Sequence, residues 1–310
     1  MYRMKRRKWK MVVFIGLIFL LAIYICIQVI RCKAAVRVGK SRLSTYKVKT
    51  AKLSYGEMKY VDQGEGAVIL SIHGIFGGYD QAYETCVNYA SDCRIIAPAR
   101  FGYLGSEVCG DGAPAEQAKA YVELLDILHI DKVYLLATSA GGSVAIRFAL
   151  DYPERVKGLI LYCSAMPRSK KPKRVIEYKM NPSLMCNDYS LYLTAPFYHL
   201  FFGIDSTVIN GIIPCADRKK GVEIDMAITN LDMIRNYDGY KVEELKMSTL
   251  IFQAKDDRLV RYSESKKSVE RFANCKFIPF DKGGHLMVGD GENIESTVLS
   301  FIKNDGQFRK

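Results

Sequence analysis

The sequence predicts an α/β protein with a mostly parallel sheet, and two observations carry this prediction. Short runs that are apolar throughout alternate with helical patterns after residue 53, which is typical of parallel strands covered on both faces. One run, 133–137, leads to Ser139 and then to a helical pattern over 143–150. Small residues, Ala137 and Gly141, flank the serine at two positions on either side, as in a nucleophile elbow. The alternative is a Ser/Gly turn that only caps a helix.

Composition and charge narrow the class of protein. The chain has 310 residues and a formal net charge of +12, but residues 1–52 hold 14 Lys/Arg and no acid. The remaining residues have a slight acidic excess, so the predicted domain lacks the basic face that nucleic-acid binding requires. The nine cysteines form no CxxC pair and no metal-type spacing with histidine, so we expect free thiols and no metal site. Nothing in the composition indicates an oligomeric state.

The N-terminal segment predicts a membrane anchor. A basic tail, 1–10, precedes an uncharged stretch, 11–30, whose length as a helix is about 30 Å, the thickness of a bilayer core. A cleaved signal peptide would have a shorter apolar region and a small-residue cleavage site. Residues 31–52 are basic and polar and are expected to form a tether, either solvated or lying on anionic headgroups. Six basic residues precede the span and five follow closely, which favours a single-pass protein with its domain on the extracytoplasmic side.

The domain is expected to consist of a core, 53–164 and 247–310, and an inserted helical lid, 165–246. In the lid segment the strand pattern stops and aromatic-rich helical stretches replace it. The predicted strands are 55–62 (an edge strand), 68–72, 94–97, 133–137, 156–163, 248–254 and 276–280. The predicted helices are 81–89, 114–128, 143–150, 263–272 and 293–302.

A serine nucleophile needs a base, and only four histidines are available. His285 lies on a glycine-rich loop after the last predicted strand, from which its ring can reach the serine. His129 ends a helix and His199 lies in the aromatic lid segment, so neither is as well placed. Two acids follow the penultimate strand, and Asp257 is preferred over Asp256, which is expected to be solvated or to cap the turn.

Acyl chemistry also needs two N–H groups facing the developing oxyanion. The residue after the nucleophile, Ala140, supplies one at the N-terminus of the following helix. The loop His73-Gly74-Ile75 after strand 68–72 is expected to supply the other from Ile75. His73 itself is interpreted as a residue that anchors this loop rather than one that transfers protons.

Taken in order, these signals resemble the α/β-hydrolase superfamily over roughly residues 55–305. The matching pieces are His73-Gly74 with Gly77-Gly78, the loop 98–106, the segment Ala137-Thr138-Ser139-Ala140-Gly141-Gly142, Asp257, and Gly283-Gly284-His285. The resemblance implies an eight-stranded, mostly parallel sheet, a cap after the sixth strand and no cofactor. Chain order Ser…Asp…His is that of the serine-nucleophile branch.

The function expected from these residues is serine hydrolysis of an ester or related acyl bond in a small-molecule substrate, with lipids among the candidates. Amide or thioester hydrolysis, carbon–carbon hydrolysis and acyl transfer remain open on the same triad, and a non-catalytic binding module is the other class. Aromatic residues are candidates for an apolar acyl pocket, although they can equally serve to pack the lid on the core: Phe76, Tyr192, Phe197 and Phe201.

Overall fold

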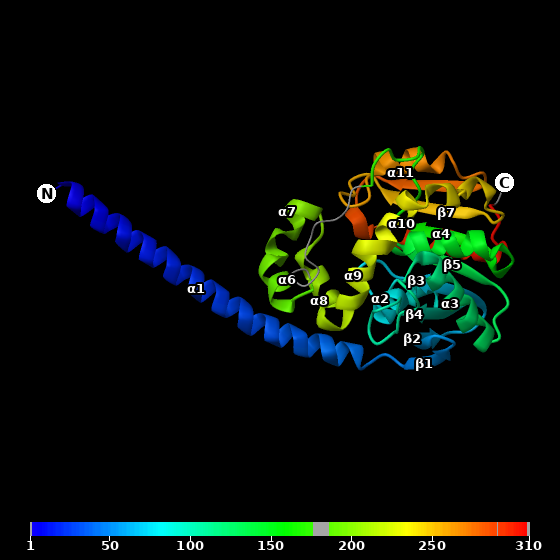
Figure 1. Cartoon of the computed structure of the whole chain (residues 1–310), viewed down its shortest axis with the longest axis horizontal. Coiled ribbons are helices and arrows are strands. Elements are labelled where there is room, and N and C mark those ends of the chain that lie inside the picture. The colour runs from blue at the N-terminus through cyan, green and yellow to red at the C-terminus, as the bar shows by residue number, and fades with distance from the viewer. Residues whose placement is uncertain (1, 176–185, 290, 309–310) are drawn as a thin grey trace.

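The computed structural model describes residues 2–175, 186–289 and 291–308, and its centre is an eight-stranded sheet (Figure 1). The strand order is β1-β2-β4-β3-β5-β6-β7-β8; β2 is antiparallel to β1 and to β4, and all other neighbours are parallel. The predicted α/β class with an eight-stranded, mostly parallel sheet is therefore confirmed. The strands are β1 (Val48–Leu53), β2 (Gly56–Gln63), β3 (Ala67–Ile72), β4 (Cys93–Pro98), β5 (Val133–Thr138), β6 (Val156–Tyr162), β7 (Thr249–Ala254) and β8 (Cys275–Phe280).

Helices cover both faces of the sheet because its central strands are apolar on both sides. In β5, Leu135 and Ala137 join the cluster under α3 and α4, whereas Tyr134 and Leu136 join the cluster under α2 and α12. The α-helices in the described residues are α1 (Tyr2–Leu43), α2 (Tyr79–Glu84), α3 (Pro114–Ile127), α4 (Gly141–Asp151), α6 (Asp188–Thr194), α7 (Tyr198–Phe202), α8 (Ile209–Ile212), α9 (Lys219–Ile224), α10 (Asn230–Arg235), α11 (Tyr262–Val269) and α12 (Gly291–Lys303).

The N-terminal boundary of the domain differs from the prediction. The expected tether, 31–52, is instead the last part of α1 followed by β1. β1 pairs with β2 from Val48 opposite Val61 to Leu53 opposite Gly56, so β2 is not the edge strand that the sequence predicts. Sequence patterns miss β1 because its first three residues are exposed and only Ala51 and Leu53 are buried.

The C-terminal part of α1 packs on the domain. Cys32 is fully buried, and a Cβ at Gly39 would lie 2.4 Å from the carbonyl oxygen of Ile213, so the helix approaches α8 closely at this glycine. Arg42 donates to the Asp80 carboxylate at 2.8 Å and to the carbonyl of Gly211 at 3.1 Å. Residues 8–27, by contrast, are exposed, and the helix is long and apolar enough to cross a membrane.

The segment between β6 and β7 is helical and has no strand among its described residues, 163–175 and 186–248. Two buried ion pairs join its second half to the core. Arg100, after β4, pairs with Asp225, and Arg218 pairs with Asp80 of α2 at 2.7 Å. All four side chains are almost completely buried, so this half of the insertion is fixed to the core.

Candidate active site

Ser139 lies in a strained turn between β5 and α4. Its φ is +51°, a conformation that costs a non-glycine residue about 1–3 kcal/mol. Surrounding contacts hold this conformation. The Ser139 N–H donates to the backbone carbonyl of Tyr162 at 3.2 Å, and the Ser139 carbonyl accepts from the N–H of Ala165 at 2.9 Å. A Cβ at Gly141 would lie 2.5 Å from the carbonyl oxygen of Ile72, so the close approach of α4 to β3 requires glycine at this position.

The structure brings the predicted serine, histidine and aspartate together. The distance from Ser139 Oγ to His285 Nε2 is 3.0 Å, and that from His285 Nδ1 to Asp257 Oδ2 is 2.8 Å. With Nδ1 protonated, the imidazole donates to the carboxylate, and Nε2 is free to accept the serine proton. The three residues come from the ends of β5, β7 and β8, whose carboxyl ends meet at one edge of the parallel sheet.

Asp257 is held by four donors. Oδ1 accepts from the N–H groups of Leu259 and Val260 at 2.8 and 3.0 Å, and Oδ2 accepts from His285 and from Gln253 Nε2 at 3.0 Å. Burial by itself would raise the pKa of this carboxyl, but the hydrogen bond and charge of His285 and the two N–H groups hold the pKa below its usual range. The carboxylate therefore stays ionised beside the imidazole.

The neighbouring acid, Asp256, lies outside the Ser139–His285–Asp257 hydrogen bonds. Asp256 is exposed, and its Oδ1 accepts from the N–H of Gly284 at 2.8 Å, so it ties down the loop that carries His285. Gly283 and Gly284 have φ values of +130° and +60°, which explains the two glycines before the histidine.

Two neighbours of the Asp257–His285 pair were not singled out from the sequence. Gln253 is a fully buried amide within the apolar strand β7, and a polar residue in such a run is a signal that the sequence did contain. Cys163 follows β6, and its sulfur, a carboxylate oxygen of Asp257 and a ring nitrogen of His285 all lie within 4.8 Å of one another. Nine scattered cysteines gave no means of selecting this one.

The Cys163 group fits a hydrogen-bonded triad better than a metal site. Burial raises the pKa of the Cys163 thiol to about 12, so the sulfur is protonated beside the triad. His285 already contacts Ser139 and Asp257 with its two nitrogens.

The loop after β3 lies against the nucleophile. A Cβ at Gly74 would be 3.0 Å from Ser139 Cβ, so this residue must be small. Among the described residues, the N–H groups of Ile75 and Ala140 donate to no other group, as an oxyanion site requires. Their role as oxyanion donors stays a prediction.

His73 holds this loop in place through hydrogen bonds of both ring nitrogens. Its Nδ1–H donates to the carbonyl of Gly74 at 2.7 Å, and its Nε2 accepts the N–H of Arg100 at 2.9 Å. Burial and the charge of Arg100 hold its pKa well below the usual value, so the ring is neutral. Both nitrogens are occupied, which fits an anchoring residue.

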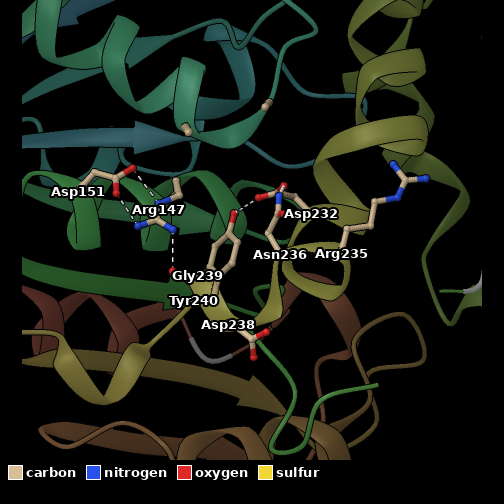
Figure 2. A pocket seen from close by; sticks show the side chains of 10 residues that line it. Arg147, Asp151, Asp232, Arg235, Asn236, Asp238, Gly239 and Tyr240 are labelled. Atoms are coloured by element: carbon tan, nitrogen blue, oxygen red, sulfur yellow. Dashed lines mark hydrogen bonds and ion pairs between the residues drawn. The ribbon is translucent and has the colours of Figure 1, made fainter. Parts of the chain in front are cut away.

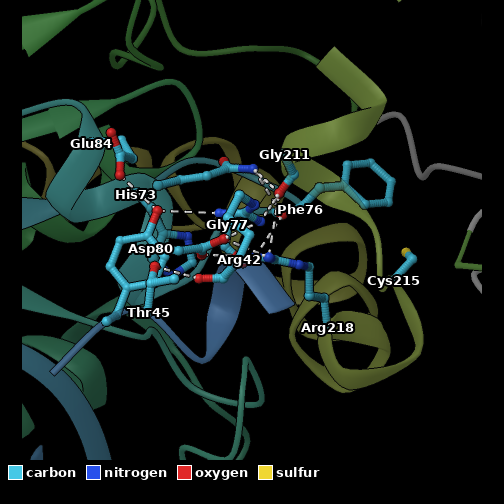
Figure 3. A network of polar contacts seen from close by, with 12 residues as sticks. Arg42, Thr45, His73, Phe76, Gly77, Asp80, Glu84, Gly211, Cys215 and Arg218 are labelled. Atoms are coloured by element: carbon cyan, nitrogen blue, oxygen red, sulfur yellow. Dashed lines mark hydrogen bonds and ion pairs between the residues drawn. The ribbon is translucent and has the colours of Figure 1, made fainter. Parts of the chain in front are cut away.

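A buried polar network holds the other end of the same loop (Figure 3). Arg218 donates to the carbonyls of Phe76 and Gly77 at 3.3 and 2.5 Å and to both oxygens of Asp80. Asp80 also accepts from Arg42, so one carboxylate connects α1, the inserted segment and the loop that carries Ile75.

The four candidate pocket residues differ in their exposure. Phe76 and Tyr192 are half-buried, whereas Phe197 and Phe201 are exposed. Phe201 lies at the surface because the short helix α7 carries apolar residues in consecutive positions, and one helix face cannot bury them all; Phe197 lies in the turn just before α7.

A cavity of about 550 Å³ lies elsewhere, between α4 and the turn after α10 (Figure 2). Its walls are charged, and Arg147 is paired within them: its side chain donates to Asp151 at 2.8 Å and to the carbonyl of Gly239 at 2.7 Å. No triad residue lines it.

Comparisons with known proteins support the α/β-hydrolase fold of this chain. A family model described as alpha/beta hydrolase fold matches residues 67–185. The uncharacterized hydrolase YcgS of Bacillus subtilis (strain 168) is 36% identical over 290 residues, which cover 83% of this chain and 99% of that protein. A 2-hydroxy-6-oxononadienedioate/2-hydroxy-6-oxononatrienedioate hydrolase of Comamonas testosteroni is 24% identical over 265 residues, covering 78% and 90%. An esterase (EaEST) from Exiguobacterium antarcticum has a similar fold, with a TM-score of 0.67 at 20% identity over 82% of this chain and 99% of that one.

Proposed function

Because the chain belongs to the α/β-hydrolase family, we propose that it is a membrane-anchored serine hydrolase that cleaves an ester or a related acyl bond. The observation that carries the proposal is the continuous line of hydrogen bonds from Ser139 through His285 to Asp257, at 3.0 and 2.8 Å. A binding module of the same fold has no need of all three groups in this geometry.

In the proposed mechanism Ser139 Oγ attacks the carbonyl carbon of the substrate while its proton passes to His285 Nε2. The oxyanion that forms accepts hydrogen bonds from the N–H groups of Ile75 and Ala140; removing one such donor typically costs about 10²–10³ in rate. Asp257 stabilises the imidazolium through Nδ1. The imidazolium then protonates the leaving alkoxide, which leaves an acyl-serine. A water molecule, deprotonated by His285, attacks this ester and releases the acid and the free serine.

We place the anchor at residues 11–30 and the catalytic domain on the extracytoplasmic side. The exposure of this part of α1 supports a lipid environment for it, because a helix of this apolar composition has no other covering in the described residues. The helical insertion between β6 and β7 is proposed to act as a lid that selects the substrate, with the half-buried Phe76 and Tyr192 as apolar contacts for the acyl group.

Carbon–carbon hydrolysis is the second candidate, and the curated relative from Comamonas testosteroni favours it. The Ser139–His285–Asp257 triad can serve either reaction, so turnover of an ester must be compared with turnover of a carbon–carbon substrate. We expect ester hydrolysis to be the faster reaction, and turnover of a 2-hydroxy-6-oxo-dienoate exceeding that of every ester would reverse the order.

The proposal is tested by labelling with a fluorophosphonate probe. The wild-type protein should be labelled, and Ser139→Ala should not be, because the probe reacts only with an activated serine. Ser263→Ala, in the surface helix α11, is the matched control and should label normally. Labelling that persists in a correctly folded Ser139→Ala protein would exclude this nucleophile.

The acyl group is tested with p-nitrophenyl esters of increasing chain length. Each buried methylene contributes about 0.8 kcal/mol, so an apolar site should raise kcat/KM several-fold for every two carbons until the chain outgrows it. We expect medium or longer chains to be preferred over acetate. A steady decline from the acetyl ester onward would mean a small polar site.

A further inference from the structure

We propose that an apolar surface beside the triad docks on the bilayer and admits substrate from it. This surface, the α7 patch, consists of Phe197, Leu200, Phe201, Phe202, Leu286 and Val288. The inference rests on the proposed membrane anchoring and goes beyond it, because it assigns a second membrane contact to the catalytic domain itself.

The α7 patch is unusually exposed for its composition. Its six side chains are between 41% and 72% exposed, and the rings of Phe201 and Phe202 lie 6.4 Å apart. A contiguous exposed patch of large apolar side chains on a soluble domain marks an interaction surface. Aromatic residues such as these are typical of the membrane–water interface.

The way α1 docks brings this patch to the bilayer. α1 packs against α6 and α8, in the same inserted segment that carries α7. Cys32 is buried at this contact, whereas residues 8–27 are exposed, so the apolar part of α1 leaves the domain beside α6. Figure 1 shows α6 and α7 on the side of the domain that faces along α1 towards its N-terminus. A bilayer around residues 11–30 therefore approaches α7.

Two features make this placement specific. The Arg42–Asp80 ion pair and the close contact at Gly39 fix the base of α1 to the domain, so the height of the patch above the span is not free to vary. Basic side chains on the docked part of α1 are exposed just beyond the apolar span, at the level of lipid headgroups: Arg31, Lys33, Arg37 and Lys40.

The patch also borders the catalytic residues. Arg258, which follows Asp257, donates to the carbonyl of Leu200 at 2.9 Å. At the end of α7, the carbonyl oxygen of Gly203 lies 3.2 Å from the position of a Cβ on Gly284, next to His285. The α7 patch therefore lies next to the loops that carry Asp257 and His285, which is the position that direct entry of an apolar substrate from the bilayer requires.

Depth-dependent fluorescence quenching tests the docking directly. The chain has one tryptophan, Trp9, so Leu200→Trp in a Trp9→Phe background gives a single probe in the full-length protein in phosphatidylcholine nanodiscs. Ile127→Trp is the matched control, since Ile127 is 46% exposed at the end of α3, and α3 lies on the side of the domain away from the N-terminal part of α1 (Figure 1). Lipids brominated near the headgroup should quench the Leu200→Trp emission at least about two-fold more than that of Ile127→Trp, as expected for an interfacial helix. Equal quenching of the two overturns the proposal, and a blue-shifted but unquenched Leu200→Trp would mean that protein, not lipid, covers the patch.

Substrate entry is tested with Leu200→Ser. The kcat/KM for a long-chain ester embedded in the nanodisc should fall about tenfold, while hydrolysis of a soluble short-chain ester should change less than about two-fold. A similar loss of kcat/KM on both substrates would indicate a structural role for Leu200 and would overturn the proposed substrate entry. An unchanged kcat/KM on both substrates would overturn it as well. If wild-type protein hydrolyses neither ester, the proposed function fails, whereas the quenching result still decides the docking.

Discussion

Replacing Asp257 by asparagine should remove catalysis without removing the fold. The carboxylate has two sides: Oδ1 accepts from the N–H groups of Leu259 and Val260, and Oδ2 accepts from His285 and Gln253. An asparagine oxygen facing the two backbone groups leaves its NH₂ facing His285 Nδ1. Nδ1 must then act as the acceptor, and the imidazole proton moves to Nε2, where it faces Ser139 and can no longer accept the serine proton.

The opposite orientation of the amide does not rescue the site. It would direct the NH₂ at the two backbone N–H groups, and each buried donor left without a partner costs about 1–3 kcal/mol. The wrong tautomer is therefore favoured, and in a Ser-His-Asp triad this error lowers kcat about 10⁴-fold. The measurement is kcat for a p-nitrophenyl ester, with the melting temperature recorded alongside.

Asp256→Asn is the matched control. An amide oxygen can still accept the N–H of Gly284, so the loop carrying His285 should stay in place and kcat should fall less than about tenfold. The assignment of the acid would be refuted if Asp257→Asn retained activity within tenfold of wild type while Asp256→Asn lost it.

The remaining predictions concern stability and membrane attachment. Asp225→Ala leaves the Arg100 charge buried and unpaired, so the free energy of unfolding measured in urea should fall by about 3–5 kcal/mol. The control Asp238→Ala removes an exposed ion pair and should lower this free energy by less than about 1 kcal/mol. Equal losses in the two variants would contradict the argument from burial. Deletion of residues 1–30 should release the protein from the membrane fraction while probe labelling persists, because the docked part of α1 begins at Cys32. If the truncated protein still sediments with membranes in high salt, the domain itself is strongly attached to them. Burial raises the pKa of Asp80, but Arg218 and Arg42 outweigh this effect and lower it. Its stabilising contribution is therefore present above the unfolded-state pKa of about 3.9 and lost as the pH falls through the lower folded-state value, so Asp80→Asn should flatten the loss of stability below about pH 4 in urea titrations.

The sequence by itself determined the order of strands and helices in the core. Apolar runs and helical periodicity are local properties, so they identify β3 to β8 within a few residues of their observed bounds. It also singled out Ser139, Asp257 and His285, because each follows a strand and parallel strands end at the same edge of a sheet. Their side chains lie within hydrogen-bonding distance in the structure.

Only the tertiary structure decided the contacts that surround these residues. Arg100 meets Asp225 across 125 positions of the chain, and no local pattern indicates which acid a distant arginine will pair with. The position of Cys163 beside Asp257 likewise follows from the pairing of β6 with β7 rather than from spacing. The basic segment after the span is polar enough to suggest a tether, yet it is helical because Cys32, Gly39 and Arg42 find partners on the domain. Burial, not composition, fixes the conformation of such a segment, and burial exists only once the chain has folded.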